Sequence, residues 1–276
     1  MEYAPNPEKL AVLGYPVSHS KSPALHSHWI VQHHVRASYE AIAIPVGDFE
    51  QDVGVLLERG FRGFNVTLPH KENAAALAEI ATEAVRATGA ANTLYLKDDK
   101  LYADNTDITG FIRNIEANAG DFDWKGGPAV LIGAGGAARS VAYALTQKNV
   151  PELRIINRTT SKAAALAEDF NGHVVTWDQR EEALEGANLV INATQLGMSG
   201  QPELDLRLDR LPETALVSDC VYTPLMTPLL AQAQRRGNTI VTGADMFFYQ
   251  AQESFHLWFG IIPLVDAEAR RAVEKG

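Results

Sequence analysis

Two features are scarce in this 276-residue chain: it has a single cysteine, Cys220, and no long hydrophobic run. One cysteine excludes an internal disulfide, and its place in the apolar stretch ALVSDCVY predicts a buried structural thiol rather than a reactive one. A membrane span needs about 18 or more consecutive apolar residues, which the sequence does not contain. The start, MEYAPNPEKL, lacks a basic segment followed by an apolar one, so we expect no signal peptide. These absences fit a reducing compartment and predict a cytoplasmic protein without a membrane partner.

Positive charge is also in short supply. The chain has 24 Lys and Arg against 34 Asp and Glu, for a formal net charge of −10. This balance argues against nonspecific nucleic-acid binding, so we expect no nucleic-acid partner. It also means that local donors must hold any anionic ligand, because the overall field opposes it.

The order of predicted elements is typical of an α/β protein, since short strand-like runs alternate with helical ones along the chain. The polar stretch NAGDFDWKGGP, residues 118–128, is the clearest linker, and the length fits two domains. Two strand-like runs around Asp98-Asp99-Lys100 predict a hairpin. We also predict a helix over 71–80 and a final long helix from about Ala244.

The segment PAVLIGAGGAARSVAYAL predicts a phosphate-binding turn. It carries G-x-G-x-x-A at Gly133, Gly135 and Ala138, after an apolar strand and before an amphipathic helix, which is the context that the motif requires. The first glycine permits the tight turn, the second lets the pyrophosphate approach the backbone, and the helix N-terminus offers unpaired N–H groups. The predicted dinucleotide contacts of this turn are Gly133, Ala134, Gly135, Gly136 and Ala137.

The end of the following strand indicates which dinucleotide is bound. NAD-binding units place an acid there for the ribose 2′-hydroxyl, whereas this chain has Asn157-Arg158-Thr159. Arg158 cannot accept a hydrogen bond and pairs well with a 2′-phosphate, and the neighbouring Asn157 and Thr159 add donors. The predicted cofactor is therefore NADP, with a solvated surface arginine as the alternative reading.

Four polar constellations interrupt the first half of the chain: SHSKSP (18–23), NVTLPHK (65–71), Asn92 and ADNTDITG (103–110). Each has a simpler explanation alone, such as a helix cap for a serine or a solvated lysine at position 71. Together they fit a site for a small polyol acid, in which serines bind a carboxylate and amides or acids hold hydroxyl groups. A lysine among them supplies the proton partner that hydride transfer to a carbonyl requires.

These motifs, with INRT, INATQLGM, DCVYTPLMTPLL and the MFFYQA tail, resemble the shikimate/quinate dehydrogenase family in order over nearly the whole chain. The resemblance implies an α/β protein with a catalytic, substrate-binding domain from residues 1–106 and 244–276. It implies a Rossmann NADP-binding domain from 107–243, with the active cleft separating the two. The implied reaction is the reversible, NADPH-dependent reduction of 3-dehydroshikimate to shikimate, an oxidoreductase step of aromatic amino-acid biosynthesis.

The resemblance also implies roles for single residues. Lys71 and Asp107 match the catalytic pair. The matching substrate contacts are Ser20, Ser22, Thr67, Asn92, Tyr222 and Gln250. Near the nicotinamide the matching positions are Thr194, Gly243 and Met246, although the Ala244-Asp245 sequence between the last two departs from the family's usual Leu-Gly.

Three alternative readings remain open at this level: a dual quinate/shikimate enzyme, an aminoshikimate-type relative, and a non-catalytic NADP-binding sensor. The serine at position 22 and Arg158 favour shikimate and NADP over quinate and NAD. Four histidines crowd one early helix without nearby carboxylate or thiolate ligands, so we expect packing or surface roles and no metal. The remaining expectation is a monomer or homodimer with a small-molecule substrate as partner.

Overall fold

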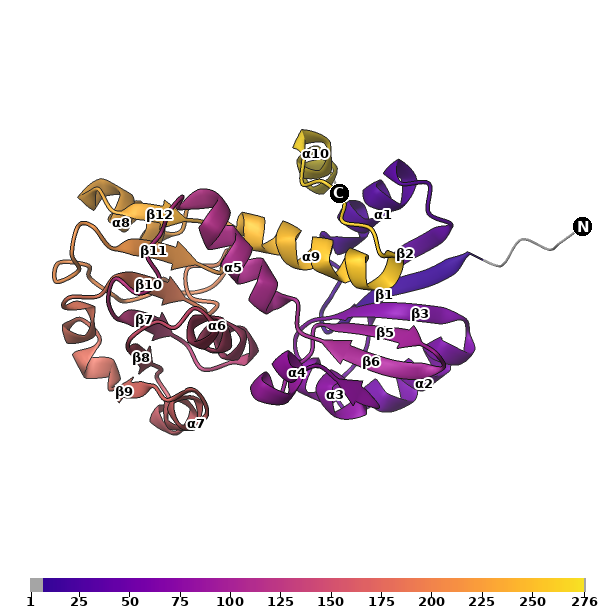
Figure 1. The fold of residues 1–276 in the computed structure, drawn as a ribbon, viewed down its shortest axis with the longest axis horizontal. Helices are drawn as coiled ribbons and strands as arrows, with labels where there is room; N and C mark the ends of the chain where they lie inside the picture. Colours follow the sequence, from indigo (N-terminus) through magenta and orange to yellow (C-terminus); the bar gives the residue numbers. More distant parts are fainter. Residues whose placement is uncertain (1–6, 276) are drawn as a thin grey trace, which may run out of the picture. The chain divides into compact units, whose positions relative to one another are not determined.

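The structure, a computed structural model, describes residues 7–275, which form two compact units (Figure 1). Unit 1 combines the N-terminal part of the chain, to Thr106, with the C-terminal part from Gln250. Unit 2 is the continuous segment Asp107–Tyr249. No helix within residues 7–275 has both the length and the apolar character needed to cross a membrane.

Unit 1 contains a mixed six-stranded sheet in the order β2-β1-β3-β5-β6-β4. Its strands are β1 (Glu8–Gly14), β2 (Ala37–Ala43), β3 (Phe61–Val66), β4 (Ile80–Ala81), β5 (Thr93–Lys97) and β6 (Lys100–Asp104). The strands β2, β1 and β3 are parallel, whereas β5 is antiparallel to both β3 and β6. The predicted hairpin is confirmed as β5–β6. Asp98 and Asp99 both take positive φ angles, 50° and 57°, as a tight two-residue turn requires.

Helices cover both faces of this sheet: α1 (Ser22–Gln32), α2 (Phe49–Glu58), α3 (Lys71–Leu77), α4 (Glu83–Thr88), the C-terminal part of α9 (Ala244–Phe259) and α10 (Ala267–Lys275). On one face, Phe49 of α2 and Ala74 of α3 pack in a cluster with Phe64 of β3. On the other face, α9 approaches so closely that a Cβ added to Gly63 would lie 2.5 Å from Nε1 of Trp258. The sheet is thereby held between two helical layers.

The predicted helix over 71–80 is wrong at its end. The chain leaves the helical conformation at Ala78, and Ile80 then pairs with Tyr102 of β6. Thr82 accepts a hydrogen bond from the N–H of Val85 and so caps the short helix α4, which the sequence pattern did not reveal. A two-residue strand carries too little periodicity to be seen in sequence.

The early histidine-rich helix is α1, and its central histidine is part of the core. The His26 ring is fully buried and stacks on Tyr39 at 4.4 Å between centroids, with Trp29 and Phe255 also in contact. Burial lowers the pKa of His26 to about 3 and outweighs an opposing influence of Asn65, so the ring is neutral. His26 therefore has a packing role in the core of unit 1.

Unit 2 contains a wholly parallel six-stranded sheet in the order β12-β11-β10-β7-β8-β9. Its strands are β7 (Ala129–Ile132), β8 (Leu153–Ile156), β9 (His173–Val175), β10 (Leu189–Asn192), β11 (Leu216–Asp219) and β12 (Thr239–Val241). Its helices are α5 (Asp107–Asn118), α6 (Gly136–Gln147), α7 (Thr160–Phe170), α8 (Pro228–Arg236) and the first part of α9. This is the doubly wound dinucleotide-binding order, with the switch point between β7 and β10, and it confirms the predicted α/β class.

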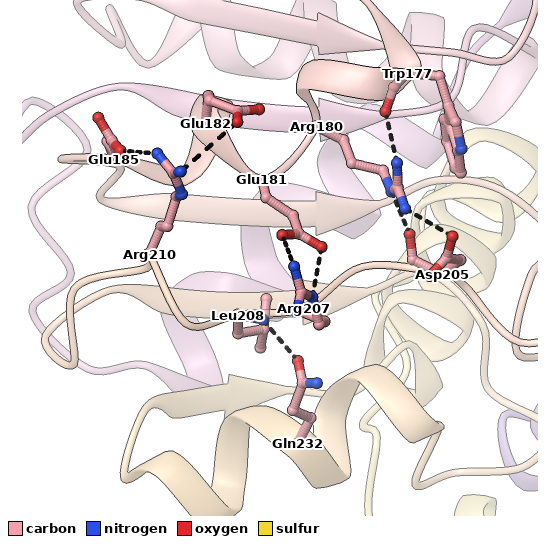
Figure 2. A network of polar contacts seen from close by, with 10 residues as sticks. All are labelled: Trp177, Arg180, Glu181, Glu182, Glu185, Asp205, Arg207, Leu208, Arg210 and Gln232. Atoms are coloured by element: carbon pink, nitrogen blue, oxygen red, sulfur yellow. Dashed lines mark hydrogen bonds and ion pairs between the residues drawn. The ribbon is translucent and has the colours of Figure 1, made fainter.

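Residues 202–208 of unit 2 form neither a helix nor a strand, yet they pack against the core of this unit. Leu204, Leu206 and Leu208 alternate inward and are buried in the core of this unit. Between and beside them, charged side chains reach the short 3-10 helices η1 (Trp177–Gln179) and η2 (Glu182–Leu184) and their flanks (Figure 2). The ion pairs join Arg180 to Asp205 at 2.7 Å, Arg207 to Glu181 at 2.7 Å, and Arg210 to Glu182 at 3.7 Å and to Glu185.

Candidate active site

The polar constellations of unit 1 lie at one edge of its sheet. In the parallel pair β1–β3, Leu13 lies opposite Val66, so both strands end together. In the antiparallel pairs, Thr93 at the start of β5 lies opposite Asn65 and opposite Asp104, at the end of β6. The segments after β1, β3 and β6 and the segment before β5 therefore meet at the carboxyl edge, where α/β proteins bind their ligands.

Backbone hydrogen bonds fix two of the candidates at this edge. The N–H of Thr67 donates to the carbonyl of Leu13 at 2.9 Å, which places Thr67 beside the end of β1. The N–H of Ala91 donates to the carbonyl of Lys71 at 2.9 Å, so the first residue of α3 is tied to the turn that carries Asn92. The Lys71 side chain is partly exposed there.

The two candidate serines differ in their surroundings. Ser20 is partly exposed, and its Oγ accepts a long hydrogen bond of 3.3 Å from the N–H of Ser22, whereas the N-cap of α1 is Lys21, without a side-chain cap. Ser22 is buried at the start of α1, and its side chain lowers the pKa of the Tyr39 phenol, an effect that burial outweighs. Tyr39 in turn donates to Oδ1 of Asn65 at 2.7 Å, and burial raises the phenol's pKa well above its usual range.

The orientation of the Asn92 amide follows from its partners. The backbone N–H of Thr106 is only a donor, and it reaches Oδ1 of Asn92 at 2.8 Å. Nδ2 of Asn92 then donates to Oε1 of Gln250 at 3.3 Å. This fixes the Gln250 amide as well, with Nε2 as the end that can donate to another oxygen. Thr106, between Asn105 and Asp107, is a site residue that the sequence analysis missed.

Asp107 is the first residue of α5 and is assigned to unit 2. It is buried, and its carboxylate in the first turn interacts favourably with the helix dipole. It directly follows Thr106 in the chain, so the hydrogen bonds of Thr106 restrain the start of this helix. The simple reading of Asp107 as an early-turn acid describes its position without excluding a chemical role.

The turn after β7 fits a dinucleotide pyrophosphate. Gly133 has φ of +120°, and a Cβ on it would lie 3.0 Å from the carbonyl oxygen of Ala193. Gly135 precedes α6, is exposed, and has no atom within 4 Å of the position that a Cβ would take. The N–H groups of Gly136 and Ala137 in the first turn of α6 have no acceptor within their own helix. Open space and converging donors are what a bound phosphate requires.

The chain after β8 presents the candidate 2′-phosphate contacts. Ile156, the last residue of β8, pairs with Ile132 of β7, so this turn lies at the same edge as the glycine turn. Nδ2 of Asn157 donates to the carbonyl of Thr159 at 2.9 Å and fixes the turn's shape. Arg158 is exposed and makes no hydrogen bond or ion pair with any residue of the range 7–275. Its guanidinium is available to an anionic ligand.

The remaining candidates of unit 2 follow β10, β11 and β12. Thr194 donates from Oγ1 to Oδ1 of Asn192 at 2.7 Å. Gly243 is close-packed, because a Cβ there would lie 2.6 Å from the carbonyl oxygen of Cys220. Cys220 itself is partly exposed, so the prediction of a buried thiol is wrong: it is the first residue beyond β11, where the chain leaves the core.

Two further candidates of unit 2 are an aromatic residue and a methionine. Tyr222 is 44% exposed and stacks on Phe247, with 5.7 Å between ring centroids. Met246 lies in the first turn of α9 and is buried. Within residues 7–275, no three His, Cys, Asp or Glu side chains gather as metal ligands would.

Two family models match the chain. The one described as "Shikimate dehydrogenase substrate binding domain" matches residues 12–94, and the one described as "Shikimate / quinate 5-dehydrogenase" matches residues 116–198. A curated shikimate dehydrogenase (NADP(+)) of Paracoccus denitrificans is 46% identical over 265 residues, which are 95% of this chain and 94% of the relative. The corresponding protein of Paramagnetospirillum magneticum is 45% identical over 95% of this chain and 96% of its own.

Solved structures agree with these relatives. The shikimate 5-dehydrogenase of Thermus thermophilus, in complex with NADP(H) and shikimate, has a TM-score of 0.86 and 36% identity, covering 97% of this chain and 99% of that one. A quinate dehydrogenase of Corynebacterium glutamicum in complex with NAD has a TM-score of 0.88 at 29% identity, covering 97% of this chain and 98% of that one. The predicted family is confirmed, and the relatives' names bear out the predicted cofactor class. This chain belongs to the shikimate dehydrogenase family.

Proposed function

We propose that the protein catalyses the reversible, NADPH-dependent reduction of 3-dehydroshikimate to shikimate. The observation that carries the proposal is the polar edge of unit 1, which gathers hydroxyls, an oriented amide pair and a lysine. This set suits a small ring that bears a carboxylate and several hydroxyl groups. The doubly wound unit 2, with an open glycine turn and an unpaired arginine, suits NADP.

Substrate binding follows from the donor types. The hydroxyls of Ser20 and Ser22 donate to the carboxylate, and Tyr222 is a further candidate contact of the substrate. Asn92 and Gln250 recognise ring hydroxyls, because their amide orientation leaves Nε2 of Gln250 as a donor. Thr67 adds a hydroxyl at the same edge.

Lys71 exchanges the proton of the reaction, and Asp107 orients the reacting hydroxyl and the lysine. In the reduction, the charged ammonium of Lys71 donates a proton to the carbonyl oxygen that becomes the hydroxyl. In the oxidation, the neutral amine accepts that proton. The carboxylate of Asp107 is the acceptor for the reacting hydroxyl.

NADPH supplies the hydride when bound. Gly133, Ala134, Gly135, Gly136 and Ala137 hold its pyrophosphate, and Asn157, Arg158 and Thr159 hold its 2′-phosphate. Around the nicotinamide, Thr194, Gly243 and Met246 provide the contacts. The protein's part is to bind, orient and exclude water from the reacting groups.

The test is an initial-rate assay of purified protein that follows the absorbance of NADPH or NADH in four combinations: shikimate or quinate, each with NADP or NAD. We expect turnover with shikimate and NADP that exceeds the other three. Faster turnover of quinate with NAD would make the protein a quinate dehydrogenase. Binding of NADP without turnover of either acid would make it a sensor and overturn the proposal.

The proposed setting is the cytoplasm, with the protein acting as a monomer or homodimer. The single cysteine and a reaction driven by NADPH support a reducing compartment. Analytical ultracentrifugation across protein concentration tests the assembly, because a species larger than a dimer would contradict it.

A further inference from the structure

The serine at position 254 lies at the centre of a buried hydroxyl cluster, formed by Thr93, Thr106 and Ser254. Oγ of Ser254 is 2.8 Å from Oγ1 of Thr93 and 3.2 Å from Oγ1 of Thr106. All three side chains are at most 1% exposed. They come from α9, from the start of β5 and from the turn after β6, so the cluster joins three elements at the polar edge of unit 1.

Ser254 also bonds outside the cluster. It accepts from Nδ2 of Asn65 at 2.9 Å and donates to the backbone carbonyl of Gln250 at 3.1 Å. Oδ1 of Asn65 accepts a hydrogen bond from the Tyr39 phenol. A buried polar group costs free energy unless it is hydrogen-bonded, and here one hydroxyl serves partners from several elements.

The cluster controls the Asn92 amide. Oδ1 of Asn92 accepts the Thr106 N–H at 2.8 Å, and the hydroxyl oxygens of Thr93 and Thr106 each lie 3.1 Å from it. Nδ2 of Asn92 donates to Oγ1 of Thr106 at 3.0 Å and to Gln250. Both ends of the amide are therefore held by groups that Ser254 contacts directly or, for Gln250, through the backbone.

We infer that Ser254 is a positioning residue for substrate recognition. Through Thr93, Thr106 and the Gln250 backbone, it holds the Asn92 and Gln250 amides in the orientation that recognises a ring hydroxyl of the substrate. The inference rests on the proposed function, because it concerns the same site. It adds Ser254 to the residues of the proposed substrate site, although Ser254 itself need not contact the substrate.

The decisive variant is Ser254→Ala. It removes the shortest acceptor of Nδ2 of Asn65, whose other acceptors lie at 3.4 Å, and one contact from each threonine, so the Asn92 and Gln250 amides lose part of their fixed orientation. We expect KM for shikimate to rise roughly tenfold, the equivalent of one to two lost hydrogen bonds, with a smaller change in kcat. The KM for NADP should not change. Ser254→Thr restores the hydroxyl and should recover most of the affinity.

The matched control is Ser218→Ala in β11 of unit 2, which removes another serine hydroxyl that is 1% exposed. We expect parental kinetic constants for it. If Ser254→Ala is too unstable to purify, Ser254→Cys keeps nearly the same shape with weaker hydrogen bonds, and a rise in KM for shikimate is expected there too.

Analogues of shikimate that each lack one ring hydroxyl separate positioning from a purely structural role. In the parent protein, loss of the hydroxyl that Asn92 and Gln250 recognise weakens binding, whereas in Ser254→Ala the same loss should cost much less. An unchanged KM for shikimate in Ser254→Ala, or equal losses for every analogue, overturns the inference while the parent's activity still supports the function. Absence of shikimate turnover in the parent protein would overturn both the inference about Ser254 and the proposed function.

Discussion

Asn192 donates from Nδ2 to Oδ1 of Asp219 at 3.0 Å, linking the ends of β10 and β11 in unit 2. The same carboxylate accepts the N–H of Val221 at 2.9 Å and the hydroxyl of Thr227 at 2.7 Å. It is 1% exposed, and burial raises its pKa from 3.8 to about 6 against the opposing effect of these donors. The group titrates close to neutral pH beside the strand ends that carry the predicted nicotinamide contacts.

We predict that Asp219→Asn flattens part of the pH dependence of stability. The folded protein holds the Asp219 proton more tightly than the unfolded chain, so its contribution is present below pH 3.8 and is lost as pH rises to about 6. The full loss is about 3 kcal/mol, for roughly two pKa units. In denaturant unfolding, the free energy of unfolding of Asp219→Asn relative to that of the parent should rise by about 3 kcal/mol between about pH 4 and about pH 7. Parallel pH profiles would contradict the shift.

Lys71→Ala should lower turnover by roughly 10²–10⁴-fold, the range for loss of a general acid or base. Its affinity for NADPH, measured by fluorescence titration, should stay at the parental value because the proposed dinucleotide contacts lie in unit 2. Lys97→Ala, an exposed lysine at the end of β5, is the control and should keep full activity. Near-normal turnover of Lys71→Ala would reduce Lys71 to a binding residue.

Arg158→Asp should shift cofactor preference from NADP toward NAD by roughly 10- to 100-fold, since a charge-assisted contact is lost and a repulsive charge replaces it. The ratio of kcat/KM for the two cofactors gives the readout, with saturating shikimate. Arg36→Asp makes the same charge change on an exposed residue of unit 1 and should leave the ratio alone. An unaltered ratio in Arg158→Asp would sink the assignment.

The ion pairs of Figure 2 should differ in their effect on stability. Arg180 donates to the carbonyls of Trp177 and Asp205 as well as to the Asp205 carboxylate, with only 17% of its side chain exposed. Arg180→Ala should lower the free energy of unfolding by roughly 1–2 kcal/mol. Arg207 pairs with Glu181 and is 70% exposed, so Arg207→Ala should have a smaller effect that salt reduces further. Equal losses in urea unfolding would contradict this ranking.

The sequence predicted best where the physical cause is local. The glycine turn at Gly133 and the Asp98-Asp99 hairpin are defined by a few adjacent residues, because only certain residues adopt their backbone angles. The alternation of short strands and helices was enough for the fold class. Motifs that recur together also indicated the family, since their order along the chain is hard to produce by chance.

The features that the sequence did not predict depend on contacts with residues far away along the chain. Ser254 looks like an ordinary polar residue on a helix, and only the folded chain shows Asn65, 189 positions earlier, donating to it. The strand β4 depends on β6, and the leucines at 204, 206 and 208 on a core that other segments build. The orientation of the Gln250 amide likewise needs the Thr106 N–H, which no local pattern reveals.

Unit 1 is assembled from both ends of the chain, with the whole of unit 2 inserted between them. During synthesis the sheet of unit 1 emerges first, yet the helix that brings Ser254 and Phe255 to it is translated only after the nucleotide-binding half. Unit 2 is free to fold while one face of the unit 1 sheet still lacks the part of its cover that α9 provides. A released chain that ended at Tyr249 would therefore contain the complete cofactor-binding unit joined to an unfinished substrate-binding unit.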